Sequence, residues 1–180
     1  MQRGKADFGL LLVGMLWGLG FVFVKIGLNE GITPFYLLTI RFLVAFIILF
    51  VIFRSRLKNI EKSDLKNGFI IATFLFLGFA FQISGAALTT ASNNAFFTAI
   101  NVIIVPYIFW AIHKHVPNIF SFIAAGLCIL GVGVLSFDSK MQFNQLNEGD
   151  ILTIISALFF AFHIAFTGFL STKSEPIKLN

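Results

Sequence analysis

Long apolar stretches alternate with short polar segments along the whole chain. Each apolar stretch holds about 20 residues, enough to cross a hydrocarbon core of about 30 Å at 1.5 Å per residue. We place these spans at residues 8–28, 34–53, 68–88, 92–112, 118–137 and 150–170. The third and fourth spans are so close in sequence that they must form an antiparallel hairpin. The pattern predicts an all-α integral membrane protein with about six transmembrane helices.

The first and sixth spans begin alike when Asp7 is aligned with Asp150. The aligned pairs are Gly14 with Ala157, Trp17 with Phe160, Gly18 with Ala161, and Ile26 with Phe169. Five crossings separate the two copies, so the second copy enters the bilayer from the opposite side. Inverted repeats of this kind are typical of secondary transporters. We therefore expect a complete five-helix repeat at residues 1–140 and the first helix of a second, truncated repeat at 149–180. Chance agreement between two apolar helices is the alternative.

The composition agrees with a membrane protein. Hydrophobic residues make up 58% of the chain and charged residues 12%, with a mean hydropathy of +0.93. Soluble domains have about a quarter of their residues charged. The single cysteine, Cys128, excludes an intrachain disulfide. The 25 Phe residues are expected to be lipid-facing bulk.

Basic residues are concentrated in alternate loops. The segments that we place on one side contain Arg3, Lys5, Arg54, Arg56, Lys58, Lys62, Lys66, Lys114, Lys173 and Lys178. The opposing loops contain only Lys140. By the positive-inside rule, both termini are cytoplasmic, and we expect a multi-pass protein of the plasma (inner) membrane. This distribution accounts for the net charge of +5, so no nucleic-acid partner is expected.

Several motifs resemble a known family. They are WGLGFVFVKIGL in the first span, TPFYLLTIRFLVA in the second, ALTTASNNAFFTAINVIIVP through the hairpin, GLCILGVGVL in the fifth, and GDILTIISALFFAFHIAFTGFL at the start of the sixth. In this order and spacing they resemble the first half, and the opening of the second half, of an EamA-type transporter of the drug/metabolite transporter superfamily. The resemblance implies ten helices in two inverted repeats, a central cavity, and export of small metabolites or drugs. The chain would then be a fragment of a ten-helix carrier.

The few polar residues inside the spans fall on shared helical faces. In the sixth span Thr153, Ser156, Phe160, His163 and Thr167 follow the spacing 3, 4, 3, 4, which defines one face. The repeat alignment transfers that face to Trp17. Equivalent faces of the third and fourth spans carry amide side chains, and Pro106 predicts a bend in the fourth span. The substrate-pathway candidates are Trp17, Gln82, Asn94, Asn101, Phe160 and His163.

Each candidate also has a structural explanation. Ser and Thr hydroxyls in membrane helices often bond to their own backbone, and Asn101 is as well suited to an interhelical hydrogen bond as to a pathway. His163 titrates near neutral pH, but a neutral histidine that donates to a backbone carbonyl is equally ordinary. Trp17 lies too deep for an interfacial residue, so we expect it in a cavity or in the core.

Two cations lie near the side from which basic residues are depleted. Lys25 and Arg41 are each a few residues from the predicted outer end of a span. Long cationic side chains in such positions reach out to the headgroups, and this is the interpretation that we prefer. The alternative is an outer-mouth role in which they neutralise a substrate carboxylate or gate the pathway.

No enzymatic motif, metal-ligand cluster or cofactor-binding loop is present in the sequence, so we expect a protein that is not an enzyme. The leading hypothesis is a secondary carrier that exports small metabolites or drugs by alternating access to a midplane cavity. Its expected partners are the small-molecule substrate, the lipid bilayer, and either a second copy of the chain or the missing C-terminal half. The alternative is a non-transporting membrane scaffold or assembly subunit.

Overall fold

The computed structural model describes residues 2–54, 60–114, 116, 118–135 and 146–171, and every element in these ranges is a helix. The prediction of an all-α fold is therefore confirmed. The helices are α1 (Gln2–Asn29), α2 (Pro34–Phe53), α3 (Lys62–Leu88), α4 (Ala91–Ala99), α5 (Asn101–His113), α6 (Ile119–Leu135) and α7 (Glu148–Leu170).

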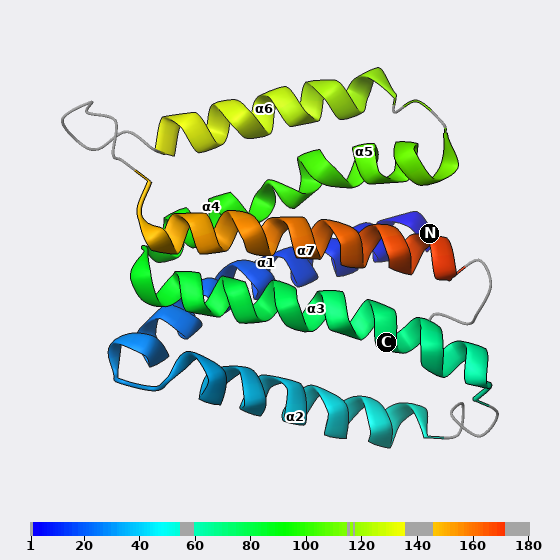
Figure 1. The fold of residues 1–180 in the computed structure, drawn as a ribbon, viewed down its shortest axis with the longest axis horizontal. Helices are drawn as coiled ribbons and strands as arrows, with labels where there is room; N and C mark the ends of the chain where they lie inside the picture. The colour runs from blue at the N-terminus through cyan, green and yellow to red at the C-terminus, as the bar shows by residue number, and fades with distance from the viewer. Residues whose placement is uncertain (1, 55–59, 115, 117, 136–145, 172–180) are drawn as a thin grey trace.

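Successive long helices alternate in direction along the chain (Figure 1). Five stretches of the described residues are long and apolar enough to cross a membrane, with α4 and α5 together forming one of them. The predicted span at 118–137 corresponds to α6, whose 17 residues extend about 26 Å, somewhat less than a hydrocarbon core. The candidate span within α1, Asp7–Asn29, agrees with the predicted 8–28, whereas that of α3, Lys62–Leu88, begins six residues before the predicted start at residue 68.

The fourth predicted span is interrupted. Helix α4 ends at Ala99 and α5 begins at Asn101. At the junction the Ile100 N–H bonds to Phe97 O, and the N–H groups of Ile103 and Ile104 both bond to Ile100 O. We expected the bend at Pro106, but Pro106 lies within α5 and the interruption comes six residues earlier. A proline affects the preceding turn, to the carbonyl four residues back, so Pro106 does not by itself account for the break at Ile100.

Helix α7 is the centre of the bundle and packs most extensively against α3 (Figure 1). Small residues recur every fourth position along one side of α7: Gly149, Thr153, Ala157, Ala161 and Ala165, all of which are buried. This pattern allows two membrane helices to approach closely. The approach is closest where Gly85 of α3 faces α7, since a Cβ atom there would lie only 2.6 Å from Gly149 O.

Aromatic rings continue the α3–α7 contact along the bundle. Phe74 stacks on Phe162 and on Phe166, with ring centroids 5.4 Å apart in each case, and Phe81 stacks on Phe159 at 5.5 Å. Offset ring pairs of this kind add packing energy beyond the burial of area. These rings are half-buried, whereas others, such as Phe8 and Phe69, are exposed, and lipid contact of the phenylalanines stays a prediction.

A polar cluster joins the ends of α3, α4 and α7. Asp150 is 3% exposed, and its carboxylate accepts a hydrogen bond of 2.6 Å from Thr89 Oγ1. The same carboxylate accepts from the Asn147 N–H, and the Asn147 side chain accepts from the Asp150 N–H, which forms a capping box. The cluster fixes where α7 begins relative to the α3–α4 turn.

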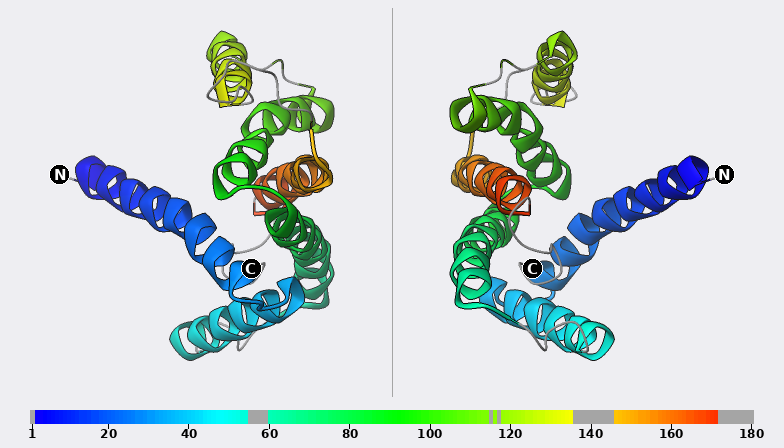
Figure 2. Two further views of the ribbon diagram at one scale, coloured as in Figure 1. Left: turned by 90° about the vertical axis from the view of Figure 1, so that its left-hand side faces the viewer. Right: turned by 90° about the vertical axis from the view of Figure 1, so that its right-hand side faces the viewer.

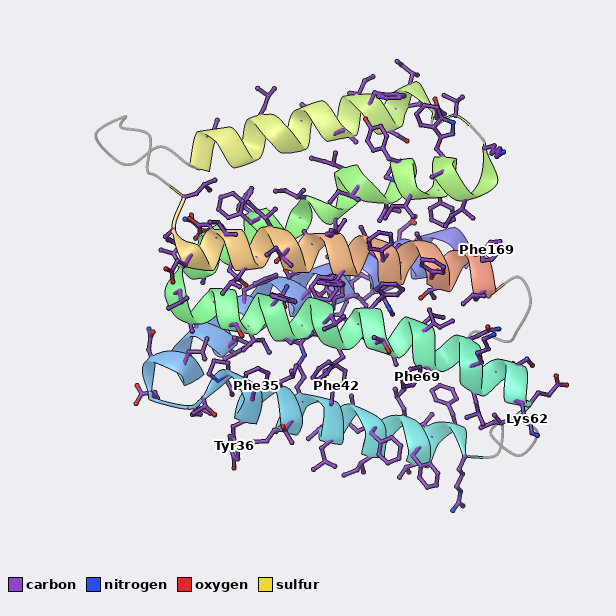
Figure 3. The ribbon with its side chains drawn as sticks, viewed as in Figure 1. Phe35, Tyr36, Phe42, Lys62, Phe69 and Phe169 are labelled. Carbon is purple, nitrogen blue, oxygen red and sulfur yellow. The ribbon has the colours of Figure 1, made fainter. Side chains whose placement is uncertain are left out.

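Helices α1 and α2 lie at the margin of the bundle. Figure 2 shows α1 diverging from the other helices toward its N-terminus, and most of its large apolar side chains are exposed. Helix α2 contacts α3 through Phe42, whose ring meets that of Phe79 edge to face at 5.7 Å. In Figure 3 the Phe42 side chain lies between α2 and α3, while Tyr36 points away from them. The cavity described next lies among these helices.

Candidate functional site

One cavity of about 160 Å³ opens among six helices. Its walls come from α1, α2, α3, α4, α5 and α7, and they combine aromatic rings, amide groups and one guanidinium. All six substrate-pathway candidates line it: Trp17, Gln82, Asn94, Asn101, Phe160 and His163. Arg41 lines it as well, whereas Lys25 does not. The faces inferred from helical spacing thus meet at one place, and the passage of a substrate through them stays a prediction.

Asn94 connects three helices on one wall of the cavity. Its side chain is 1% exposed, and Nδ2 donates to Gln82 O at 3.0 Å and to Thr153 Oγ1 at 2.8 Å. The Gln82 amide in turn donates to Thr98 Oγ1 at 3.1 Å, and Thr98 donates to Asn94 O at 2.7 Å. Asn94 has therefore committed both of its N–H donors to neighbouring helices, while Gln82 keeps its side-chain oxygen without a described donor.

Asn101 differs from Asn94 although both carry the same functional group. It is 7% exposed and is the first residue of α5, immediately after the helix interruption. Within the described part of the chain, the Asn101 side chain makes no hydrogen bond, and its backbone N–H has no described acceptor. Among the described residues, Thr167 Oγ1 is the one fully buried side-chain polar atom without a partner, so the Asn101 amide is still reached through the cavity. Its contact with the cavity offers the place where a ligand or water satisfies it.

His163 and Phe160 form the α7 side of the cavity. His163 Nδ1 lies 3.2 Å from Ile71 O. Because a carbonyl only accepts, Nδ1 carries the proton, and in the neutral ring Nε2 is then an acceptor. The Phe160 ring is 6% exposed, packs against Gly78, and meets Phe79 edge to face at 5.0 Å. The structural explanation for His163, donation to a backbone carbonyl, is thus present together with its position in the cavity wall.

Arg41 contacts an aromatic ring. Its Cζ lies 4.3 Å from the centroid of the Phe79 ring, a cation–π contact of about 0.5–2 kcal/mol. Arg41 is the eighth residue of α2, which places its Cα about 10 Å along the helix from its start. Among the described residues no acidic group pairs with it and none lines the cavity. Because a charged side chain within a membrane helix is unfavourable unless an opposite charge or water accompanies it, this guanidinium favours an anionic or water-filled environment.

Lys25 has a partner that the sequence did not predict, where we had considered contact with the headgroups or an outer-mouth role. Its Nζ donates to Ala86 O at 2.8 Å and to Ala87 O at 3.5 Å. These carbonyls belong to the last turn of α3, where cations offset the negative end of the helix dipole. Lys25 therefore caps α3 and ties the C-terminal end of α1 to it.

The remaining members of the α7 polar face are accounted for differently. Thr153 donates to Gly149 O at 2.7 Å and Ser156 to Thr153 O at 2.6 Å, so the preferred structural explanation is confirmed for these two. Thr167 is the exception, because its buried hydroxyl has no partner in the described structure. Trp17 lines the cavity from α1 and is 60% exposed overall, so it lies where the cavity opens beside α1.

Two cavity residues were missed from the sequence although a signal was present. Phe79 contributes the ring under Arg41, and Thr98 accepts from Gln82. Phe79 precedes Gln82 by three residues and Thr98 follows Asn94 by four, which places each on the face already identified. Neither residue is among the pathway candidates inferred from the sequence.

Comparisons with known proteins agree on the class of this chain. The model of the EamA-like transporter family matches residues 4–137. A protein of Archaeoglobus fulgidus described as an uncharacterized transporter is 36% identical over 179 residues, which is 99% of this chain and 54% of that protein. Another uncharacterized transporter of the same organism is 30% identical over 170 residues, 89% of this chain and 56% of that protein. The chain thus spans about half the length of these relatives. No solved structure matches it.

Proposed function

Because the chain belongs to the EamA-like transporter family, we propose that it forms part of a secondary carrier whose substrate occupies the cavity among α1, α2, α3, α4, α5 and α7. The observation that carries the proposal is the convergence of Arg41, Asn101, His163 and two aromatic rings on one cavity of about 160 Å³. Carriers of this type bind their substrates near the midplane, beside interrupted helices. The break between α4 and α5 supplies such an interruption beside Asn101.

Alternating access requires part of the bundle to move against the rest. Helices α3 and α7 are joined by close glycine contacts and stacked rings, so they form the stable part. Helix α1 packs more loosely, diverges toward its N-terminus (Figure 2), and carries Trp17 at the cavity opening. We infer that α1 moves relative to the α3–α7 pair and that Lys25, bonded to α3, lies near the pivot. Outward transport from the cytoplasm is the direction that we propose.

The test is solute counterflow with the intact protein in proteoliposomes. Vesicles are loaded with a metabolite extract, and labelled extract components that accumulate are identified by mass spectrometry. Asn101→Leu, which keeps the branching of the side chain but removes the amide, is expected to lower accumulation about threefold or more. The matched control is Thr39→Val, an exposed position of α2 outside the cavity whose hydroxyl bonds only to Phe35 O, and it should accumulate like wild type.

The scaffold alternative gives a different result. A scaffold would show no counterflow of any extract component, although it folds and inserts normally. Equal accumulation by wild type and Asn101→Leu would support the carrier function but contradict substrate binding in this cavity.

A further inference from the structure

We infer that the cavity binds a small organic anion, with a carboxylate opposite Arg41 and a compact aromatic or apolar body against the rings. The inference rests on the proposed function and adds the chemical class of the substrate. Three observations carry it: the charge of the cavity wall, the unpaired groups at the start of α5, and the size and lining of the space.

The charge of the cavity wall has one sign. Arg41 is its single permanent charge, since its other lining residues are aromatic, aliphatic, amide or hydroxyl side chains together with His163. The second cation considered, Lys25, is bonded to the carbonyls of Ala86 and Ala87 and does not line the cavity. A wall with one guanidinium and no carboxylate attracts anions and disfavours cations.

The start of α5 adds hydrogen-bond donors. Asn101 is 7% exposed and lines the cavity without a described side-chain partner. The backbone N–H of Asn101, at the beginning of α5, also has no described acceptor. A helix N-terminus carries partial positive charge and favours anions, and interrupted membrane helices place such ends against anionic substrate groups. The polar end of the ligand is therefore expected on the side of Arg41 and Asn101.

The space fits a body about the size of one ring. A cavity of 150 Å³ in another protein holds benzene, and this one measures about 160 Å³. The rings of Trp17, Phe21, Phe79 and Phe160 are part of its apolar lining. Benzoate has this size and charge and is the probe that we choose.

The experiment measures equilibrium binding of radiolabelled benzoate to the intact protein in phosphatidylcholine nanodiscs. Two competitors of nearly the same shape vary only the charge: benzamide is neutral and benzylamine is cationic. Benzoate is expected to displace the label at least about tenfold better than either. Arg41→Gln is expected to weaken binding about tenfold or more, and Asn101→Leu about threefold to tenfold. Lys66→Gln, which removes an exposed cation of α3 outside the cavity, is the matched control and should bind like wild type.

Several outcomes overturn the inference. Equal competition by benzamide, stronger competition by benzylamine, or absence of benzoate binding each excludes the anionic class. Equal losses in Arg41→Gln and Lys66→Gln would mean general attraction of anions to a basic protein.

A lipid phosphate is the other anion within reach of Arg41. If it is the natural partner, phosphatidylglycerol in the nanodiscs abolishes benzoate binding, and the substrate assignment fails. Counterflow of an extract component without benzoate binding would support the carrier function and exclude an anionic substrate. Benzoate binding without counterflow would support the anion site and contradict the carrier function.

Discussion

The contact between Gly85 and α7 provides the sharpest test of the packing. In a Gly85→Ala variant the new Cβ would lie 2.5 Å from Thr153 Oγ1 and 2.6 Å from Gly149 O, while ordinary contact begins at 3.4 Å. The hydroxyl is able to rotate, but the carbonyl belongs to the backbone of α7. The helices must therefore separate locally by about 0.8 Å, which also stretches the 2.8 Å hydrogen bond between Asn94 and Thr153.

Two effects oppose each other in this variant. Alanine favours the helix over glycine by about 0.8–1.0 kcal/mol, whereas overpacking of this kind is unfavourable by about 1–3 kcal/mol and sometimes more. Gly18→Ala isolates the first effect, because no atom lies within 4 Å of a Cβ at Gly18. We expect Gly85→Ala to be less stable than Gly18→Ala by about 1–3 kcal/mol, a factor of roughly 5 to 150 in the unfolding equilibrium. The measurement is reversible unfolding in mixed micelles, with helix content as the signal. Equal stability of the two variants would refute the close approach of α3 and α7.

Three further predictions follow from single contacts. Thr153→Val removes the hydroxyl that accepts from Asn94, so unfolding in mixed micelles should show a loss of about 1 kcal/mol; Thr39→Val, whose hydroxyl bonds only to Phe35 O within α2, should lose less, and the reverse order would contradict the network. Lys25→Met keeps the apolar stem but loses the α3 cap, so stability should fall by about 1 kcal/mol; unchanged stability with loss of counterflow would instead favour the outer-mouth role. Single cysteines at Glu30 and at Asn118, with Cys128 replaced by Ala, should be labelled by impermeant reagents from outside and inside respectively; labelling from the same side would exclude the proposed topology.

The sequence predicted the helices well because the bilayer imposes the same constraint on every span. In a bilayer every backbone polar group needs an internal partner, so a long apolar stretch has few alternatives to a helix. The turn between α1 and α2 has a local signal in the sequence. Pro34 begins α2, and Gly31 takes a positive φ of 87° in the turn. Topology relative to the cytoplasm stays a prediction, because the helix arrangement is compatible with either side.

The interruption at Ile100 was not predictable from local pattern. The segment Phe96 to Ile104 contains no glycine or proline, and the strongest signal nearby, Pro106, pointed to a different position. The break depends instead on what surrounds it: Asn94 and Thr98 bond to the backbone and side chains of α3 and α7. Such tertiary partners are absent from a single sequence. The small-residue pattern of α7, in contrast, was readable at every fourth position from Gly149 and would have indicated the face that packs against α3.

Helical spacing selected the cavity face correctly but does not separate its structural members from its binding members. Asn94 and Asn101 lie seven residues apart on one face and both line the cavity. Asn94 has both donors bonded to neighbouring helices, so its replacement damages packing whether or not a substrate is present. Asn101 has no described side-chain bond, so its replacement is expected to leave packing nearly intact and to change ligand binding. The same contrast applies to the two cations, because Lys25 is bonded to α3 while Arg41 has only the face of Phe79. A polar residue in a membrane helix is therefore not by itself evidence of a binding site. The residues expected to bind a ligand are those that line a cavity and have no hydrogen-bond or ion-pair partner within the described protein.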